Sequence, residues 1–218
     1  MSIHDWKQYH KMWLQELNLL LDGQTGILRE EYSLYRRCPL CGSDNAKVLF
    51  FKTGFRFVQC DECRFVYVNP IVNDSAVQNV HSGAAYNYCY EKVEPSADEF
   101  RRAKSVLRQI NNYVKAGRLL DVGCGSGAFL KVAKSFGFET WGCELNEAGA
   151  KKAEAISGAK VVRKKIEDTD FPSEYFDVIT FFQVLEHLED PLAMLKEASR
   201  ILKRGGCSSL TCPISIAS

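Results

Sequence analysis

One short segment of the chain, "LLDVGCGSGAFL" (119–130), constrains the fold more than any other. Its first residues are apolar, as in a buried strand, and its last residues begin a helical pattern. The three glycines between them must therefore form a tight turn. Such a turn lets the backbone approach a ligand closely and presents amide N–H groups at the start of a helix. The segment predicts a strand–turn–helix unit with a ligand at the turn.

Strands and helices alternate after this turn. Short apolar runs predict strands at 138–144, 159–163, 176–182 and 207–212, and helical patterns fall at 146–157 and 191–203. This alternation predicts an α/β fold with a doubly wound, mostly parallel sheet that helices cover on both faces. Ligands of such sheets lie beyond the carboxyl ends of the strands, where the glycine turn falls.

The spacing of the glycines limits which class of ligand can be expected at the turn. Gly123, Gly125 and Gly127 form G-x-G-x-G, which differs from the G-x-x-G ending of dinucleotide sites. Glu144 ends the next strand, where a carboxylate can accept hydrogen bonds from both hydroxyls of a ribose. A glycine turn alone is equally consistent with a purely structural turn. Combined with Asp121 and Glu144, it predicts a site for a nucleoside without a pyrophosphate.

Two Cys-x-x-Cys pairs point to a metal. Eighteen residues separate Cys38 and Cys41 from Cys60 and Cys63, a spacing typical of a four-thiolate zinc site. Two short strands are expected around 52–54 and a third at 65–68, as in a zinc ribbon. Because thiolates take all four positions, the zinc is expected to be structural. The alternatives are unrelated buried cysteines or a redox dithiol.

These features divide the chain into four parts. We expect an N-terminal helix and linker at 1–33, the zinc ribbon at 34–70, a polar linker or lid without regular structure at 71–95, and a cofactor-binding domain at 96–218. Ser96 and Glu99 form a capping box at the start of the last part.

The overall charge argues weakly against nucleic acid and anionic membranes as partners, although a local charged patch is compatible with it. The formal net charge of +1 gives no electrostatic reason to expect nucleic acid or an anionic membrane as a partner. No apolar segment approaches the roughly 20 residues that cross a bilayer, and the N-terminus lacks a signal-peptide pattern. A cytoplasmic protein is expected.

The motifs resemble those of class I S-adenosylmethionine-dependent methyltransferases. The resemblance covers residues 96 to about 213 and rests on "LLDVGCGSG", "WGCE", "IEDTDFPSEYFDVI" and "VLEHLEDP". The earlier "CPLCGS" and "CDECRFVYVNP" resemble the zinc-binding N-terminal region of some bacterial and archaeal members, sugar methyltransferases among them. The resemblance implies a Rossmann-like methyltransferase fold with S-adenosylmethionine as cofactor.

The resemblance also assigns roles to individual positions. It places the methionine end of the cofactor at Asp121, Gly123, Cys124 and Gly125, the ribose at Glu144, the adenine between Leu145 and Ile166 with Glu167 at its edge, and the sulfonium near Gln183. Gly127 shapes the turn. One position departs from the pattern, because many relatives carry an acidic residue where this chain has Lys165.

Methyl transfer needs a positioned acceptor and a base for its proton. His187 is the candidate base, since an imidazole titrates near working pH, and the alternative is that it braces the following loop. Tyr86, Tyr88 and Tyr90 are candidates for an aromatic lid over the cationic methyl group, or else for ordinary linker packing.

The predicted function is methyl transfer to a small molecule, with a sugar or glycan precursor implied by the resemblance. Methylation of RNA or protein, with the ribbon as recognition module, is one alternative, and a catalytically silent scaffold is another. Relatives usually continue past the fifth strand into two more strands, so the domain is expected to be incomplete at its C-terminus. A homo-oligomer would cover the open sheet edge.

Overall fold

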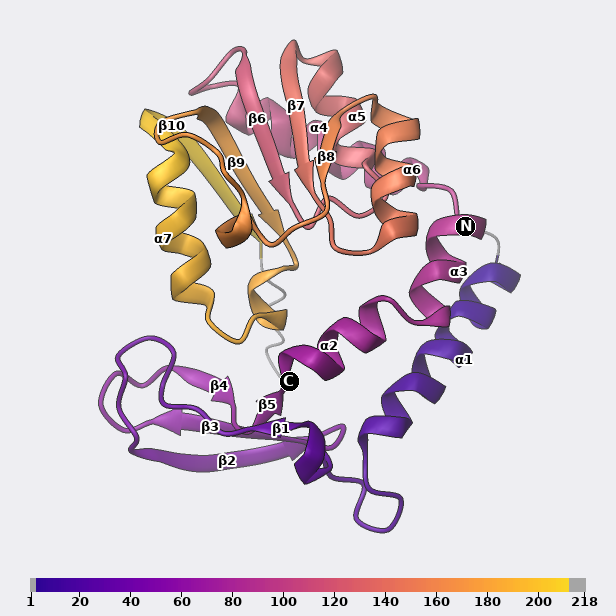
Figure 1. Cartoon of the computed structure of the whole chain (residues 1–218), viewed down its shortest axis with the longest axis vertical. Coiled ribbons are helices and arrows are strands. Elements are labelled where there is room, and N and C mark those ends of the chain that lie inside the picture. The colour runs from indigo at the N-terminus through magenta and orange to yellow at the C-terminus, as the bar shows by residue number, and fades with distance from the viewer. Residues whose placement is uncertain (1–2, 212–218) are drawn as a thin grey trace.

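A computed structural model describes residues 3–211 of the chain (Figure 1). Its largest part is a five-stranded sheet in the order β10-β9-β6-β7-β8, and every neighbouring pair of strands is parallel. The strands are β6 (Gly117–Val122), β7 (Phe138–Cys143), β8 (Lys160–Val162), β9 (Phe176–Phe182) and β10 (Leu202–Thr211). The doubly wound α/β fold is thus confirmed, and the strand order reverses at β6, the strand that leads into the glycine turn.

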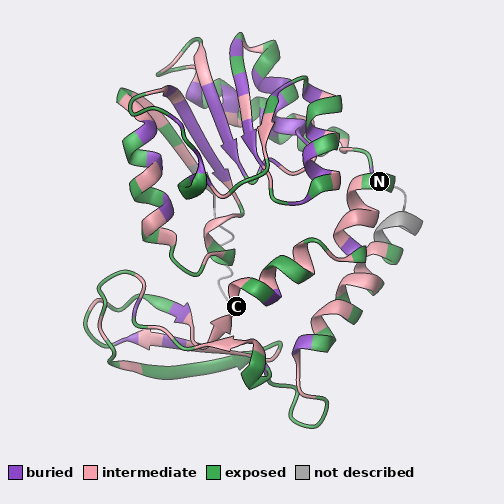
Figure 2. Ribbon diagram, in the orientation of Figure 1, coloured by how far each residue is buried: buried purple, intermediate pink, exposed green. Residues whose placement is uncertain are grey.

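Helices cover both faces of this sheet. They are α4 (Ala97–Ile110), α5 (Ala128–Ser135), α6 (Glu147–Ser157) and α7 (Pro191–Ile201). On one face Leu107 of α4 packs in a single apolar cluster with Leu119 and Leu130, and on the other Met194 of α7 packs with Phe176. Burial of these apolar side chains is the main force that holds the layers together. The central strands β6, β7 and β9 are largely buried, whereas the outer strands β8 and β10 are more exposed (Figure 2).

The cysteine-containing segment folds as the sequence predicts, into a small antiparallel sheet in the order β2-β3-β4. Its strands are β2 (Ala46–Lys52), β3 (Phe55–Cys60) and β4 (Val66–Val68). A two-stranded ladder of β1 (Ser33–Leu34) and β5 (Ile71–Val72) closes its base, after the 3-10 turn η1 (Glu30–Tyr32). We call residues 33–72 the ribbon. It lies opposite the carboxyl ends of β6, β7 and β9 (Figure 1).

The expectation of irregular structure at 71–95 is wrong. The segment forms two helices, α2 (Asp74–His81) and α3 (Ala84–Lys92), which pack with the N-terminal helix α1 (Ile3–Leu20). The Asn73 side chain caps α2 by accepting from the Ala76 N–H. At the start of α3 the carboxylate of Glu16, on α1, accepts from the Ala85 N–H at 3.0 Å. We call α1, α2 and α3 the helical cap.

None of the helices within residues 3–211 is both long and apolar enough to cross a bilayer.

Candidate functional site

The glycine turn follows β6 at the switch point of the sheet. Gly123, Gly125 and Gly127 all have positive φ, at 71°, 51° and 77°. A Cβ on Gly127 would lie 2.6 Å from the Cα of Ala153 in α6, so no larger residue fits there. The N–H groups of Gly123 and Cys124 both donate to the carbonyl of Cys143, which fixes the turn against the end of β7.

Two carboxylates lie beside this turn, one half-buried and one buried. Glu144 accepts from the Gly125 N–H at 2.9 Å and from the Asn146 N–H at 2.8 Å. Burial raises its pKa. Asp121 is 2% exposed and accepts from the Thr180 hydroxyl at 2.7 Å. Burial, together with the charge of Glu144, raises the pKa of Asp121 to about 7. The two carboxylates concentrate negative charge beside the turn, which favours the binding of an organic cation. The residues present therefore fit a sulfonium nucleoside with an ammonium group.

The other positions assigned by resemblance surround the turn. Cys124 is buried, and Leu145 is 44% exposed directly after Glu144. Ile166 lies in the 3-10 turn η2 (Ile166–Asp168), where its side chain is 1% exposed and packs in the core. Glu167 follows it and is exposed. Gln183, directly after β9, is exposed with a φ of +56°, a conformation that non-glycine residues rarely adopt and that often marks functional sites.

Lys165, the one departure from the family pattern, is held by the helical cap. Its ammonium forms an ion pair with the Asp74 carboxylate at the start of α2. The hydrogen bond from this pair raises the pKa of Lys165. The lysine therefore links the cap to the loop that precedes η2.

Aromatic side chains of the cap lie over the glycine turn. The Tyr90 hydroxyl is 3.7 Å from where a Cβ on Gly125 would stand, and its ring is 3.0 Å from the corresponding point on Gly149. The Tyr86 ring lies 6.3 Å from that of Tyr90 and 4.8 Å from that of His81. Tyr88, on the same helix, is half-buried. Tyr90 thus faces the turn, and the Tyr86 ring lies beside it.

His187 lies in the 3-10 turn η3 (Leu185–His187), which follows β9. Its ring packs edge-on against that of His81 in α2, with ring centres 5.2 Å apart. Burial, and the charge of His187, lower the pKa of His81 to about 4. His187 is exposed to solvent. Partial burial of its ring by surrounding protein atoms lowers its pKa, and the opposing effect of the Glu186 charge is smaller. Both imidazoles are therefore neutral at pH 7 and able to accept a proton.

Asn146 is a site residue that the sequence analysis missed. It is 4% exposed, and its side-chain oxygen caps α6 by accepting from the Gly149 N–H at 2.8 Å. Its amide nitrogen donates to the His81 carbonyl at 2.7 Å and to the Asn87 side chain at 2.9 Å. The one available signal was an Asn two residues after Glu144 and directly before a helix. Asn146 joins the helical cap to the loop that carries Glu144.

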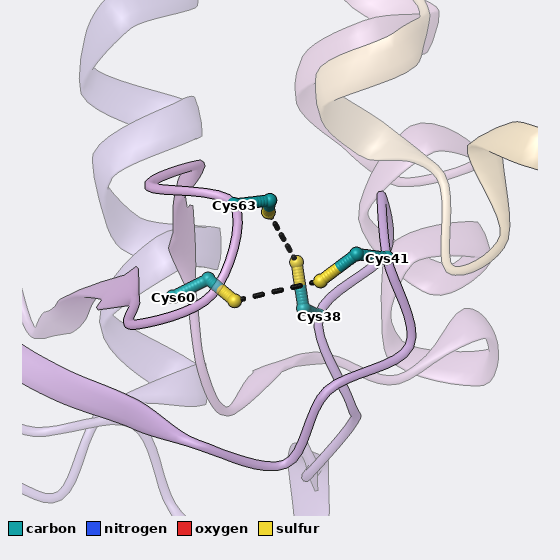
Figure 3. Close-up of side chains that lie close together, drawn as sticks. All are labelled: Cys38, Cys41, Cys60 and Cys63. Atoms are coloured by element: carbon teal, nitrogen blue, oxygen red, sulfur yellow. Dashed lines mark hydrogen bonds between the residues drawn. The ribbon is translucent and has the colours of Figure 1, made fainter.

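The four cysteines of the ribbon come together (Figure 3). Their Sγ atoms all lie within 4.8 Å of one another, and the Cys38–Cys63 and Cys41–Cys60 pairs are 3.5 Å apart. Thiolates on one tetrahedral zinc stand about 3.8 Å apart when each Zn–S bond is about 2.3 Å. The backbone N–H of Cys63 lowers the pKa of Cys60 to about 7, whereas burial and the neighbouring thiols outweigh the Phe65 N–H and raise the pKa of Cys63 to about 12. The cluster is compatible with zinc.

Comparison with known proteins agrees with this geometry. A profile described as "Methyltransferase domain" matches residues 88–211, more than half of the chain. An uncharacterized protein of Methanocaldococcus jannaschii is 40% identical over 103 residues, which are 47% of this chain and 48% of that protein. A ubiquinone biosynthesis O-methyltransferase of Nitrosomonas europaea is 32% identical over 94 residues, 40% of each chain. The matches thus span less than half the length of these curated relatives.

Among solved structures, the PH0226 protein of Pyrococcus horikoshii OT3 superposes with a TM-score of 0.51 at 24% identity, covering 57% of this chain and 58% of that one. This similarity concerns the fold alone. Together with the family profile and the parallel sheet, it leads to one conclusion: the chain belongs to the methyltransferase domain family, in the class I S-adenosylmethionine-dependent group.

Proposed function

We propose that this chain binds S-adenosylmethionine at the glycine turn and transfers its methyl group to a small molecule held under the helical cap. The main observation in support is the pair of carboxylates beside the glycine turn, Asp121, which is buried, and Glu144, which is half-buried and bonded to the Gly125 N–H. When bound, the cofactor supplies an electrophilic methyl group on a positively charged sulfur. A site with excess negative charge stabilises that cation.

The assignment by resemblance gives each residue a task. The Glu144 carboxylate accepts two backbone N–H groups, which fix its direction, and its remaining lone pairs are available to ribose hydroxyls. Leu145 offers an exposed apolar side chain to one face of the adenine. Asp121, Gly123, Cys124 and Gly125 serve the methionine end, and Gln183 borders the sulfonium. The rings of Tyr86 and Tyr90 exclude water from the reacting atoms.

His187 is proposed as the base that accepts the proton of the acceptor nucleophile. Its lowered pKa keeps the imidazole neutral at pH 7, as a base requires. Its position after β9 is at the same edge of the sheet as the glycine turn, because the carboxyl ends of parallel strands share one edge.

The acceptor is proposed to react through an oxygen. The O-methyltransferase from Nitrosomonas europaea supports this choice by name. None of the relatives named above is described as acting on a sugar, so a sugar or glycan precursor is one arm of the test, and small phenols are the other. The four-cysteine cluster is proposed to hold structural zinc.

Calorimetric titration of S-adenosylmethionine into the purified chain tests the cofactor site, with Glu144→Ala as the variant. We expect stoichiometric binding that weakens at least tenfold in the variant, because two charge-assisted hydrogen bonds of about 1.5 kcal/mol or more each are lost. Glu147→Ala, an exposed neighbour paired with Lys151, is the matched control.

Turnover is then followed as S-adenosylhomocysteine formed with panels of phenols and sugars. Binding without turnover on any panel member would favour the silent scaffold. No binding to the folded chain would refute the proposed cofactor site.

A further inference from the structure

An arginine of the ribbon, Arg36, contacts the methyltransferase domain. The Arg36 Nη1 donates to the carbonyl of Glu189 at 2.7 Å and to that of Leu188 at 3.3 Å. These carbonyls directly follow His187 in the chain. Figure 1 shows the ribbon below the segment that joins β9 to α7. We call residues 183–190 the β9–α7 loop.

The ribbon holds Arg36 firmly from its own side. The Arg36 N–H donates to the Asn69 side chain at 3.1 Å, and the same side chain donates back to the Arg36 carbonyl at 3.0 Å. The guanidinium also lies 5.9 Å from the centre of the Tyr67 ring. Arg36 stands two residues before Cys38, so its backbone is fixed by the fold of the cysteine cluster. Its side chain is therefore a rigid donor aimed at the loop.

The guanidinium is not placed for the stability of the ribbon alone. Its Nε is buried without a hydrogen-bond partner among the described residues, which costs free energy. The Nη1 of the same guanidinium donates to two loop carbonyls. A side chain buried at such a cost in free energy is best explained by its effect on the loop.

The loop itself has little internal support. Within it, the described backbone hydrogen bonds are those from the N–H of His187 to Val184 and from the N–H of Leu188 to Leu185. Gln183 begins the loop at a φ of +56°. Val184, Leu185 and Leu188 pack against the apolar core around Met194. The ring of His81 contacts His187, and Asp190 caps α7. Arg36 adds hydrogen bonds to the loop backbone between His187 and Asp190.

We propose that Arg36 is a positioning residue, through which the ribbon fixes the β9–α7 loop so that Gln183 and His187 face the bound cofactor. The proposal rests on the proposed function for the role of these two residues. It gives the ribbon a task in the reaction beyond its own folding: the metal knuckle sets the position of Arg36, and Arg36 sets the position of the loop.

The test compares Arg36→Ala and Arg36→Lys with the unmodified chain, in the presence of zinc. Amide hydrogen exchange is measured at His187 and Leu188 with and without saturating S-adenosylmethionine. In the unmodified chain we expect the cofactor to slow exchange at these amides about tenfold, and in Arg36→Ala less than twofold, because the loop is no longer held. Arg36→Lys retains one charged donor and should restore part of the effect.

Arg37→Ala is the matched control, because Arg37 is adjacent but exposed and pairs with Asp44 at the surface. It should behave as the unmodified chain. Zinc content and exchange in β2–β4 are measured in every variant, to separate loss of the loop contact from loss of the ribbon.

Each result decides the proposal. Unchanged loop exchange in Arg36→Ala, with the ribbon intact, would overturn it, and so would equal loosening of ribbon and loop. If the unmodified chain binds no S-adenosylmethionine, the proposed function fails. Exchange at His187 without cofactor then still reports whether Arg36 holds the loop, since faster exchange in Arg36→Ala alone supports the contact and an unchanged rate refutes it.

Discussion

Removal of the Asn146 side chain should loosen the helical cap. The side chain makes three hydrogen bonds, one to the Gly149 N–H and two to the cap, at the His81 carbonyl and the Asn87 side chain. Asn146→Ala removes all three. Asn146→Ser is the matched variant. Serine is about as good an N-cap for α6 as asparagine, but it has no amide nitrogen to donate to the His81 and Asn87 groups of the helical cap.

The size of the effect follows from these contacts. Loss of the helix cap costs about 1 kcal/mol. Loss of two hydrogen bonds at a buried site costs about 0.5–1.5 kcal/mol each. We therefore expect Asn146→Ala to lower the free energy of unfolding by about 2–4 kcal/mol and Asn146→Ser by about 1–3 kcal/mol. Both variants lose the two hydrogen bonds to the helical cap, so this shared loss of stability should be localised in the helical cap.

Urea unfolding measures the total loss in the free energy of unfolding. Amide hydrogen exchange in α2 and α3 measures the local loss in the helical cap. A local loss of about 1–3 kcal/mol should speed exchange there about 5–150-fold in both variants. If Asn146→Ser leaves exchange in α2 and α3 at the unmodified rate, Asn146 only caps α6 and does not hold the helical cap.

Two further predictions concern charge and metal. The pKa of Asp121 rises from 3.8 to about 7 on folding, so its contribution to stability is complete below pH 3.8 and is lost as the pH rises through 7. The difference in melting temperature between Asp121→Asn and the unmodified chain should therefore favour the variant more at pH 8 than at pH 5. An equal difference at both pH values would contradict this. Chelation of the metal should unfold the ribbon, because two of its four core residues, Cys38 and Cys60, are themselves candidate ligands and metal binding is worth about 10–16 kcal/mol. Exchange in β2–β4 should rise while that in β6 does not, and persistent protection of β3 after chelation would argue against a zinc-dependent fold.

Much of the fold could be predicted from the sequence, because local patterns encode it. The run at 176–182 coincides with β9, and α7 begins at Pro191 as expected. The capping box at Ser96 starts α4. In each case a local sequence pattern marks the element: an apolar run, a proline at a helix start, or a capping box. The boundaries at 33, 70 and 95 stay a prediction.

Interactions between distant residues could not be predicted. The helix α3 depends on a carboxylate from Glu16, which is 69 residues away from the N–H it accepts. Lys165 looked anomalous in the sequence because its partner, Asp74, lies 91 residues earlier. Local propensity does not report such contacts, so residues 71–95 were expected to be irregular, and Asn146 and Arg36 were not identified as links between parts.

The span of the Arg36 contact has a consequence for the order of folding. The four cysteines lie within one short stretch, and the antiparallel strands of the ribbon close small loops. Arg36 and the carbonyls it reaches are 152 and 153 residues apart. Closing so long a loop is entropically costly until both ends are already ordered. During synthesis the ribbon leaves the ribosome well before β9 and α7, and domains generally fold as units in that order. The Arg36 contact should therefore form last, after both modules are complete, so that the β9–α7 loop is fixed only in a chain whose two parts have both folded correctly.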